Sequence, residues 1–316
     1  MSNEQLWERF YRSMLRIRRV EERIIDIYWD DPIKSPVHLA IGQEAVATGV
    51  CEALNPDDVL FGTYRSHHVY LAKGGDMKLM MAELYGKVTG SSRGKAGSMH
   101  LVDPERGVTT TSAVVATTIP IGAGYAYALK LRKESRIAVV FFGDGAVDEG
   151  VFHETMNFAA LKQLPILFVC ENNAYAVHSH HLERHMQSNL CERVETYGIP
   201  AQFVGGNDVL AIHEATKDAV KSIREGNGPR FIEAETYRWM EHVGPGEDFA
   251  LGYRTAEERQ PWIDDDQLVR AENQLDADRS ASIKTEVEDE IATAFEFAEN
   301  SPFPDASELL ANVYAE

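Results

Sequence analysis

Two oxygen-bearing side chains follow two neighbouring apolar segments of this chain. Asp144 comes one residue after the apolar, β-branched run 136–142, and Asn173 comes shortly after the apolar run 166–170. Runs of this kind are typical of strands buried on both faces of a parallel sheet. A carboxylate and an amide supply the hard oxygen ligands that Mg²⁺ and Ca²⁺ prefer. The two residues are therefore candidate cation ligands.

The segment between the two runs is expected to be a helix. Asp148 and Glu149 place acids at its N-terminus, where the helix dipole favours them, and Pro165 follows its end. The resulting βαβ unit, with an expected right-handed crossover, brings Asp144 and Asn173 to one sheet edge, where open α/β sheets bind ligands. Free N–H groups at the helix start suit phosphate, so the pattern predicts a cation that holds a diphosphate. The alternative is a helix cap at Asp144 and a simple turn at Asn173.

The motif also has a family resemblance. Gly143-Asp144-Gly145 is followed, after the 26 residues 146–171, by Asn172-Asn173. This spacing resembles the thiamin diphosphate motif, and residues 6–254 resemble the α subunit of the E1 component of 2-oxo-acid dehydrogenases of the pyruvate, branched-chain and acetoin types. The resemblance implies an α/β thiamin-diphosphate-binding fold with a mostly parallel sheet and helices on both faces. It implies thiamin diphosphate and Mg²⁺ as cofactors, with Ca²⁺ as the alternative cation.

The same resemblance assigns site residues. The metal ligands that it implies are Asp144, Asn173 and the backbone carbonyl of Tyr175, and the cofactor contacts around them are Gly143, Gly145 and Ala146. It places Tyr64 and Arg65 on the diphosphate, where a planar, permanently charged guanidinium suits two phosphate oxygens. Ala113 and Val115 fall where the family contacts the aminopyrimidine and supports the bent cofactor. The residues by themselves favour core packing for Val115.

Two histidines are expected near the reaction centre. His67 matches a family histidine that would handle a proton or bind a substrate carboxylate. His242 matches the second histidine of the family sequence His-Gly-His-Ser, which contacts the diphosphate and the active site. Met240, Glu241 and Val243 replace the other three positions, so the serine that is phosphorylated in some relatives is absent. This departure, together with the unusual sequence 244–251, leaves the substrate and the acceptor open.

A further histidine-rich segment covers residues 178–185, with His178, His180, His181 and His185. Such a cluster could bind zinc, but no cysteine or carboxylate completes a ligand set. A loop that faces the substrate is the favoured interpretation.

Composition and charge describe an ordinary globular chain. It has 316 residues, 44% hydrophobic and 26% charged, and three scattered cysteines that favour a reducing compartment. A net charge of −19 disfavours nucleic acid as a partner. The N-terminus lacks the features of a signal or transit peptide, which predicts a cytoplasmic protein.

The organisation expected from the pattern is one thiamin-diphosphate-binding domain over residues 1–316. It begins with a helical arm over 5–28, whose basic residues Arg16, Arg18 and Arg19 are interpreted as a solvated flank. A second helix is expected over 38–54, and an acidic, largely helical tail over 256–316.

The activity implied by the resemblance is decarboxylation of a 2-oxo acid or cleavage of acetoin, followed by acyl transfer to a lipoyl-E2. In the family the carboxylate that activates the aminopyrimidine comes from a β subunit, so an α₂β₂ heterotetramer with a site at the αβ interface is expected. Two alternatives stay open: the α half of a carboligase or transketolase-like enzyme that passes the carbanion to an aldehyde, and a non-catalytic cofactor-binding subunit.

Overall fold

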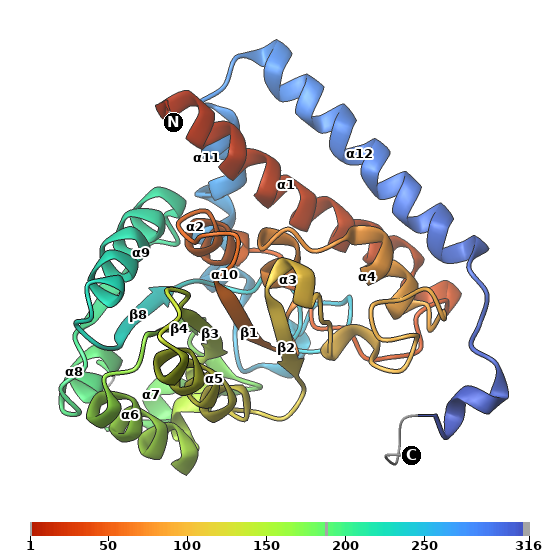
Figure 1. Ribbon diagram of the computed structural model, residues 1–316. Helices are drawn as coiled ribbons and strands as arrows, with labels where there is room; N and C mark the ends of the chain where they lie inside the picture. The colour runs from red at the N-terminus through yellow and green to blue at the C-terminus, as the bar shows by residue number, and fades with distance from the viewer. Residues whose placement is uncertain (1, 187–188, 312–316) are drawn as a thin grey trace.

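The computed structural model describes residues 2–186 and 189–311, which are arranged around one parallel sheet (Figure 1). Its strand order is β2-β1-β3-β4-β8-β7, and every neighbouring pair is parallel. The strands are β1 Val59–Thr63, β2 Val108–Ser112, β3 Ala138–Gly143, β4 Ile166–Asn172, β7 Ala201–Val204 and β8 Arg230–Glu235. A short antiparallel hairpin, β5 Tyr175–Ala176 and β6 Ser179–His180, follows β4. The α/β fold with a parallel sheet is confirmed.

Helices cover both faces of the sheet, and each face has its own apolar core. Along β3 and β4 the side chains alternate: Val139 and Leu167 enter one core, whereas Val140 and Phe168 enter the other. The first core is packed by α1 Asn3–Ile27, α2 Glu44–Cys51, α3 His67–Ala72, α4 Met77–Leu84, α9 Val209–Arg224, α11 Gln267–Glu272 and α12 Ala277–Asn300. The second is packed by α5 Thr118–Arg132, α6 Gly150–Lys162 and α8 Leu190–Glu195. The remaining helices are α7 His181–Arg184 and α10 Ala256–Asp264.

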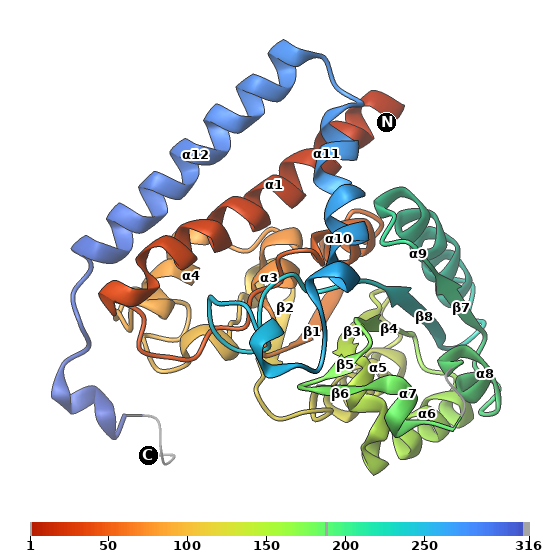
Figure 2. The same ribbon diagram turned by 180° about the vertical axis from the view of Figure 1, so that it is seen from behind.

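The first and last long helices lie side by side, as both views show (Figures 1 and 2). Arg16 of α1 pairs with Glu290 of α12 at 2.7 Å, and Arg19 pairs with Glu288 at 2.6 Å. Arg18 is 6% exposed and is paired with Glu44 and Asp266. The interpretation of this basic cluster as a solvated flank holds for the exposed Arg19 but was wrong for Arg18, which is buried against two carboxylates, while Arg16 is partly buried against the acidic helix from the other end of the chain. The last residues of the tail, 312–316, lie outside the described residues.

The helix expected over 38–54 was too long, because α2 begins only at Glu44. Before it the backbone is tied to another segment: the Trp239 N–H donates to the Ile41 carbonyl at 2.9 Å, and the Gly244 N–H donates to the Val37 carbonyl at 2.8 Å. Gly42 has a φ of +94° and lies against the Trp239 indole. These tertiary contacts replace the helical hydrogen bonds that the apolar spacing suggested.

No helix of residues 2–186 and 189–311 has the length and apolarity needed to cross a membrane.

Helix α5 has one glycine packed against the sheet and another with open space beside it. The pair gives a matched test of the packing. A Cβ atom on Gly122 would lie 2.3 Å from Val140 Cγ2, whereas a Cβ on Gly124 would meet no atom within 4 Å. Gly122→Ala should therefore push α5 off β3 and lower the free energy of unfolding by about 1–3 kcal/mol. Gly124→Ala should leave it unchanged or raise it by up to about 1 kcal/mol, because alanine favours helix. Urea unfolding of the purified chain measures both; equal effects would contradict this packing.

Candidate functional site

One cavity of about 230 Å³ opens at the carboxyl ends of β1, β3 and β4. Each strand contributes the residues that directly follow it, as expected for a ligand site on an open parallel sheet. The residues that line it come from six segments: Gln43; Thr63, Tyr64 and Arg65; Ser112, Val114, Val115, Ala116 and Thr118; Gly143, Asp144, Gly145, Ala146 and Glu149; Glu171, Asn173, Tyr175, Ala176 and Val177; and His242. The edge predicted from the βαβ unit is thus where the candidate ligands meet.

Asp144 lies at the start of the 3₁₀ turn η4 Asp144–Asp148, immediately after β3. Its side chain is only 2% exposed, and burial raises the pKa of the carboxyl to about 6, although the neighbouring Arg184 guanidinium opposes that rise. Gly145 must be a glycine for close approach, since a Cβ there would lie 2.7 Å from the Ala176 Cβ of the hairpin. The hairpin is therefore pressed against the turn that carries Asp144. The expected helix start at Asp148 is shifted, because α6 begins at Gly150 with Glu149 as its N-cap.

Asn173 is held from both sides in the same cavity. Its amide nitrogen donates to Gln43 Oε1 at 3.1 Å, and its amide oxygen accepts the Tyr175 N–H at 3.2 Å. The Tyr175 hydroxyl donates to Glu258 at 2.8 Å, which holds the tyrosine ring. Because the amide nitrogen of Asn173 donates to Gln43, the amide oxygen, which has a second lone pair, is the atom that can bind a cation.

Arg65 is a buried cation that has no acidic partner in the part of the chain that the structure describes. Its guanidinium donates to the Leu39 carbonyl at 2.5 Å and to the His242 carbonyl at 3.1 Å, and the residue is 6% exposed. Within residues 2–186 and 189–311 no carboxylate forms an ion pair with it. Burial lowers the pKa of this guanidinium to about 10. A buried charge of this kind is costly unless it is paired, so the cavity is suited to an anion that binds Arg65.

Three rings surround Arg65. The ring centroids of His38 and Tyr64 are 4.5 Å apart, and those of His38 and His242 are 5.4 Å apart. Burial, with the nearby Arg65 charge, lowers the pKa of both His38 and His242 to about 3. Both imidazoles are therefore neutral near pH 7, and His38 Nδ1 is buried without a hydrogen-bond partner in the described part of the chain.

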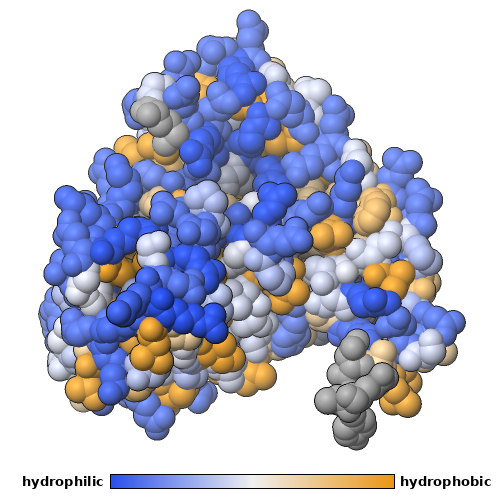
Figure 3. Space-filling view, in the orientation of Figure 1, coloured by the Kyte–Doolittle hydropathy of each residue, from blue (hydrophilic) through white to orange (hydrophobic). Residues whose placement is uncertain are grey.

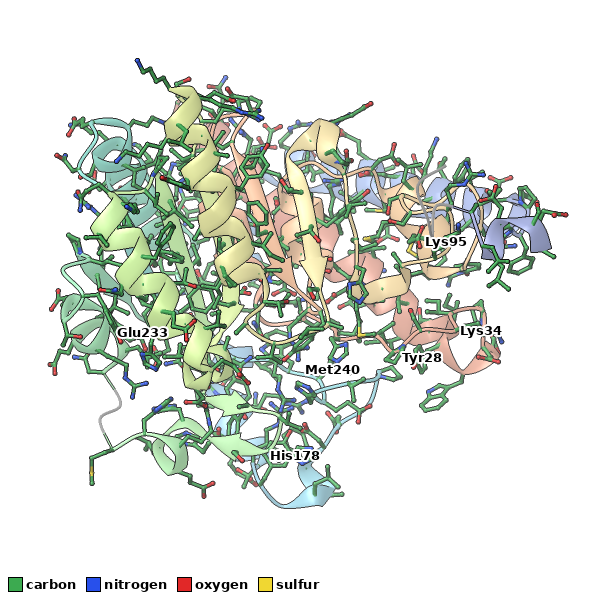
Figure 4. All side chains as sticks on the ribbon, turned by 60° about the horizontal axis from the view of Figure 1, so that its bottom comes forward. Tyr28, Lys34, Lys95, His178, Glu233 and Met240 are labelled. Atoms are coloured by element: carbon green, nitrogen blue, oxygen red, sulfur yellow. The ribbon has the colours of Figure 1, made fainter. Side chains whose placement is uncertain are left out.

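The atypical loop 240–251 is held by a buried ion-pair cluster. Asp248 accepts from Arg238 at 2.9 Å and from Arg254 at 2.6 Å, and Arg254 also donates to the Met240 carbonyl at 2.7 Å. Arg238 reaches across to the Val177 carbonyl at 3.1 Å. Figure 4 shows the segment with Met240 beside the hairpin with His178, whose ring centroid lies 4.6 Å from that of Tyr253 in a tilted arrangement. The cluster places His242 at the cavity although the surrounding sequence is unusual.

Most of the residues predicted for the site line this cavity, but two do not. His67 is fully buried beneath it, with Nδ1 3.0 Å from Glu21 and Nε2 2.7 Å from Ser98. Ala113 is not among the lining residues, whereas Val115, 45% exposed, does line the cavity, so core packing does not describe Val115. His67 and Ala113 keep their roles only as predictions.

Sequence reasoning missed several residues at the cavity. Gln43 falls within the helix expected over 38–54, and Glu171 is the last of the 26 residues before Asn172-Asn173. Both line the cavity, and Glu171 contacts His68 Nε2 at 2.6 Å. Val177 also lines it, with a φ of +55° that is uncommon for a β-branched residue. The position of Glu171 directly before Asn172-Asn173 was the signal that could have revealed it.

The donor set fits a diphosphate held by a divalent cation. Asp144 and Asn173 offer oxygen atoms, and the buried Arg65 offers positive charge to phosphate. Among the described residues no three histidine, cysteine or acidic side chains are grouped as a metal site. The histidine-rich segment instead forms β6 and α7, where the rings of His180 and His181 stack at 4.5 Å.

Comparison with known proteins gives consistent matches over almost the whole chain. Residues 12–307 match the family model described as dehydrogenase E1 component. The chain is 37% identical over 314 residues to the α subunit of acetoin:2,6-dichlorophenolindophenol oxidoreductase of Bacillus subtilis, covering 98% of this chain and 93% of that protein. It is 38% identical over 318 residues to the pyruvate dehydrogenase E1 α subunit of Zymomonas mobilis, covering 98% and 88%.

The two neutral histidines predict a pH dependence of stability. Their pKa values near 3 lie below the ordinary value of 6.5, so the unfolded chain binds more protons than the folded chain between these values. Stability should therefore fall as the pH drops below 6.5. The variants His38→Gln and His242→Gln each lack one of these imidazoles. In each of them the number of protons taken up on unfolding, which sets the slope of stability against pH, should fall by up to one. Urea unfolding at a series of pH values from 8 to 4.5 gives the free energy of unfolding of the wild type and both variants. Its slope against pH should be the same in all three proteins above pH 7.5. A variant with the same slope as the wild type at pH 5 would contradict the burial argument.

Proposed function

This chain belongs to the dehydrogenase E1 component family, and we propose that it is the α subunit of a thiamin-diphosphate-dependent E1 that acts on a 2-oxo acid or acetoin. The observation that carries the proposal is the meeting of Asp144, Asn173 and the unpaired Arg65 in one cavity. The relatives named as pyruvate and acetoin enzymes support this reading over a carboligase or a non-catalytic subunit. A cytoplasmic location stays a prediction from the N-terminal sequence.

The family uses thiamin diphosphate, and the residues in this cavity suit each part of its anchor. Asp144, Asn173 and the Tyr175 carbonyl would hold Mg²⁺, and Arg65, Tyr64 and His242 would hold the diphosphate. Thiamin diphosphate supplies the nucleophilic carbon and the electron sink for cleavage next to a carbonyl, so the protein contributes orientation and electrostatics. Burial of Arg65 strengthens its attraction for the diphosphate, because the local dielectric is low.

His242 and the apolar wall complete the assignment. His242 is neutral at pH 7, so its ring can donate one hydrogen bond and accept another near the diphosphate. Val114, Val115 and Val177 give the cavity an apolar side that is 45–63% exposed in this chain by itself. An apolar wall of this kind suits the alkyl part of a small 2-oxo acid or of acetoin. Dye-coupled turnover with pyruvate, branched-chain 2-oxo acids and acetoin, compared with the same acid plus an aldehyde, identifies the substrate and acceptor.

A β subunit is the partner we propose for the exposed side of this cavity. Val114, beside the cavity, is 63% exposed, and Ile121 on α5 is 50% exposed next to the open position of Gly124. Figure 3 shows apolar residues gathered over α5 and α6 on this face. Covering this face in an α₂β₂ assembly would close the cavity and bring in the carboxylate that activates the aminopyrimidine.

Removing the candidate metal ligands tests the cofactor assignment. In the reconstituted αβ complex, Asp144→Ala and Asn173→Ala should each weaken Mg²⁺-dependent binding of thiamin diphosphate by at least about 100-fold and abolish dye reduction, because each removes an oxygen ligand. Isothermal titration calorimetry and the dichlorophenolindophenol assay measure the two effects. Asp276→Ala, which removes only the N-cap of α12, is the control. Wild-type turnover in the Asp144→Ala complex would contradict the proposed function.

A bulky residue on the open face of α5 tests the β interface. Gly124→Leu should leave the folded chain intact, since nothing lies within 4 Å of a Cβ there, but it should hinder close approach of a partner. We expect the isolated variant to melt like the wild type and to assemble with the β subunit at least about tenfold more weakly in sedimentation experiments. Glu214→Leu, on an exposed position of α9, is the matched control. Unimpaired assembly of Gly124→Leu would place the β subunit elsewhere.

A further inference from the structure

Arg184 contacts the candidate metal ligand Asp144, although it lies forty residues further along the chain. It is the last residue of α7, the one-turn helix that follows the hairpin, and its side chain is 14% exposed. Its Nη2 donates to Asp144 Oδ2 and its Nη1 donates to Asp148 Oδ2. The guanidinium fork therefore joins the first and last residues of η4.

The contact involves only one of the two carboxylate oxygens. Within residues 2–186 and 189–311, Arg184 is the only side chain that hydrogen-bonds the Asp144 carboxylate, and it takes Oδ2. Oδ1 is left without a side-chain donor on a residue that lines the cavity. The Asn173 amide is oriented in a comparable way: its nitrogen donates to Gln43, and its oxygen accepts the backbone N–H of Tyr175 but no side-chain donor among the described residues.

Arg184 need not leave when a cation arrives. Its Nε donates to the Ser179 carbonyl at 3.3 Å, so the guanidinium is held beside Asp144 by contacts that do not involve Asp144. The charges of Asp144, Asp148 and Arg184 sum to −1, which still attracts a divalent cation. A partner of this kind orients a ligand and commonly tunes metal affinity.

Resting on the proposed function, we propose that Arg184 is a positioning residue for the metal site. It fixes the Asp144 carboxylate so that Oδ1 is left for the cation, and its contacts with Asp148 and the Ser179 carbonyl hold it in that position. The opposite role, a cation that fills the site until the metal displaces it, predicts the opposite sign of effect when Arg184 is removed.

The experiment measures metal affinity directly, using Mn²⁺ as the probe in the reconstituted αβ complex with thiamin diphosphate. Electron paramagnetic resonance counts free Mn²⁺, which gives the dissociation constant without relying on turnover. Arg184→Met should raise that constant about 10–100-fold, the effect typical of losing a partner of a metal ligand. Arg184→Lys, which keeps the charge but not the fork, should fall between this variant and the wild type.

A matched control separates positioning from general stability. Arg224 pairs with the buried Asp58, far from the cavity at the other end of the sheet, so Arg224→Met removes a similar ion pair. It should lower the melting temperature and leave the Mn²⁺ constant unchanged. Excess Mn²⁺ should restore cofactor binding in Arg184→Met, which a folding defect would not allow.

The outcomes are distinct. Unchanged or tighter Mn²⁺ binding in Arg184→Met, with normal binding by the wild type, would overturn the positioning role and leave the proposed function intact. Failure of the wild-type complex to bind Mn²⁺ and thiamin diphosphate at all would overturn both.

Discussion

The burial of charge at one edge of the sheet is the constraint on which the site depends. Asp144 and Arg65 lie within one cavity with almost no exposure, and each would be costly there without an opposite charge. Arg184 partly neutralises Asp144. Among the described residues, the Arg65 guanidinium hydrogen-bonds only carbonyl oxygens. The cavity thus holds a carboxylate for a cation and a positive charge for an anion. A site for a ligand with two or three negative charges and its cation would require both. The cavity is thus prepared electrostatically before any ligand binds.

The segment 240–251 shows how a site can be kept while the sequence around it changes. Its residues depart from the family pattern around His242, yet Arg238, Asp248 and Arg254 form a buried cluster that determines the path of the loop. Arg238 also binds the Val177 carbonyl, so the same cluster supports the hairpin on the other side of the cavity. The path of the loop that carries His242 is therefore held by this ion-pair cluster, together with the hydrogen bonds between Glu241 and Gly246.

The ends of the chain are linked by charge as well. The chain has a net charge of −19, and part of its acidic tail meets the basic residues of α1 within the same chain. Figures 1 and 2 show α12 beside α1 and away from the sheet. The apolar stripe of α12, including Ile283 and Val287, enters the core of that face.

The sequence by itself determined the parts that depend on local order. The apolar runs of β3 and β4, the break at Gly143-Asp144-Gly145 and the asparagine pair follow from residue type and spacing, and parallel strands necessarily bring Asp144 and Asn173 to one edge. Only the tertiary structure decided the shortened α2, the burial of His67 and Arg18, and the contact of Arg184 with Asp144. These depend on hydrogen bonds and ion pairs between segments distant in the chain, whose partners periodicity does not identify.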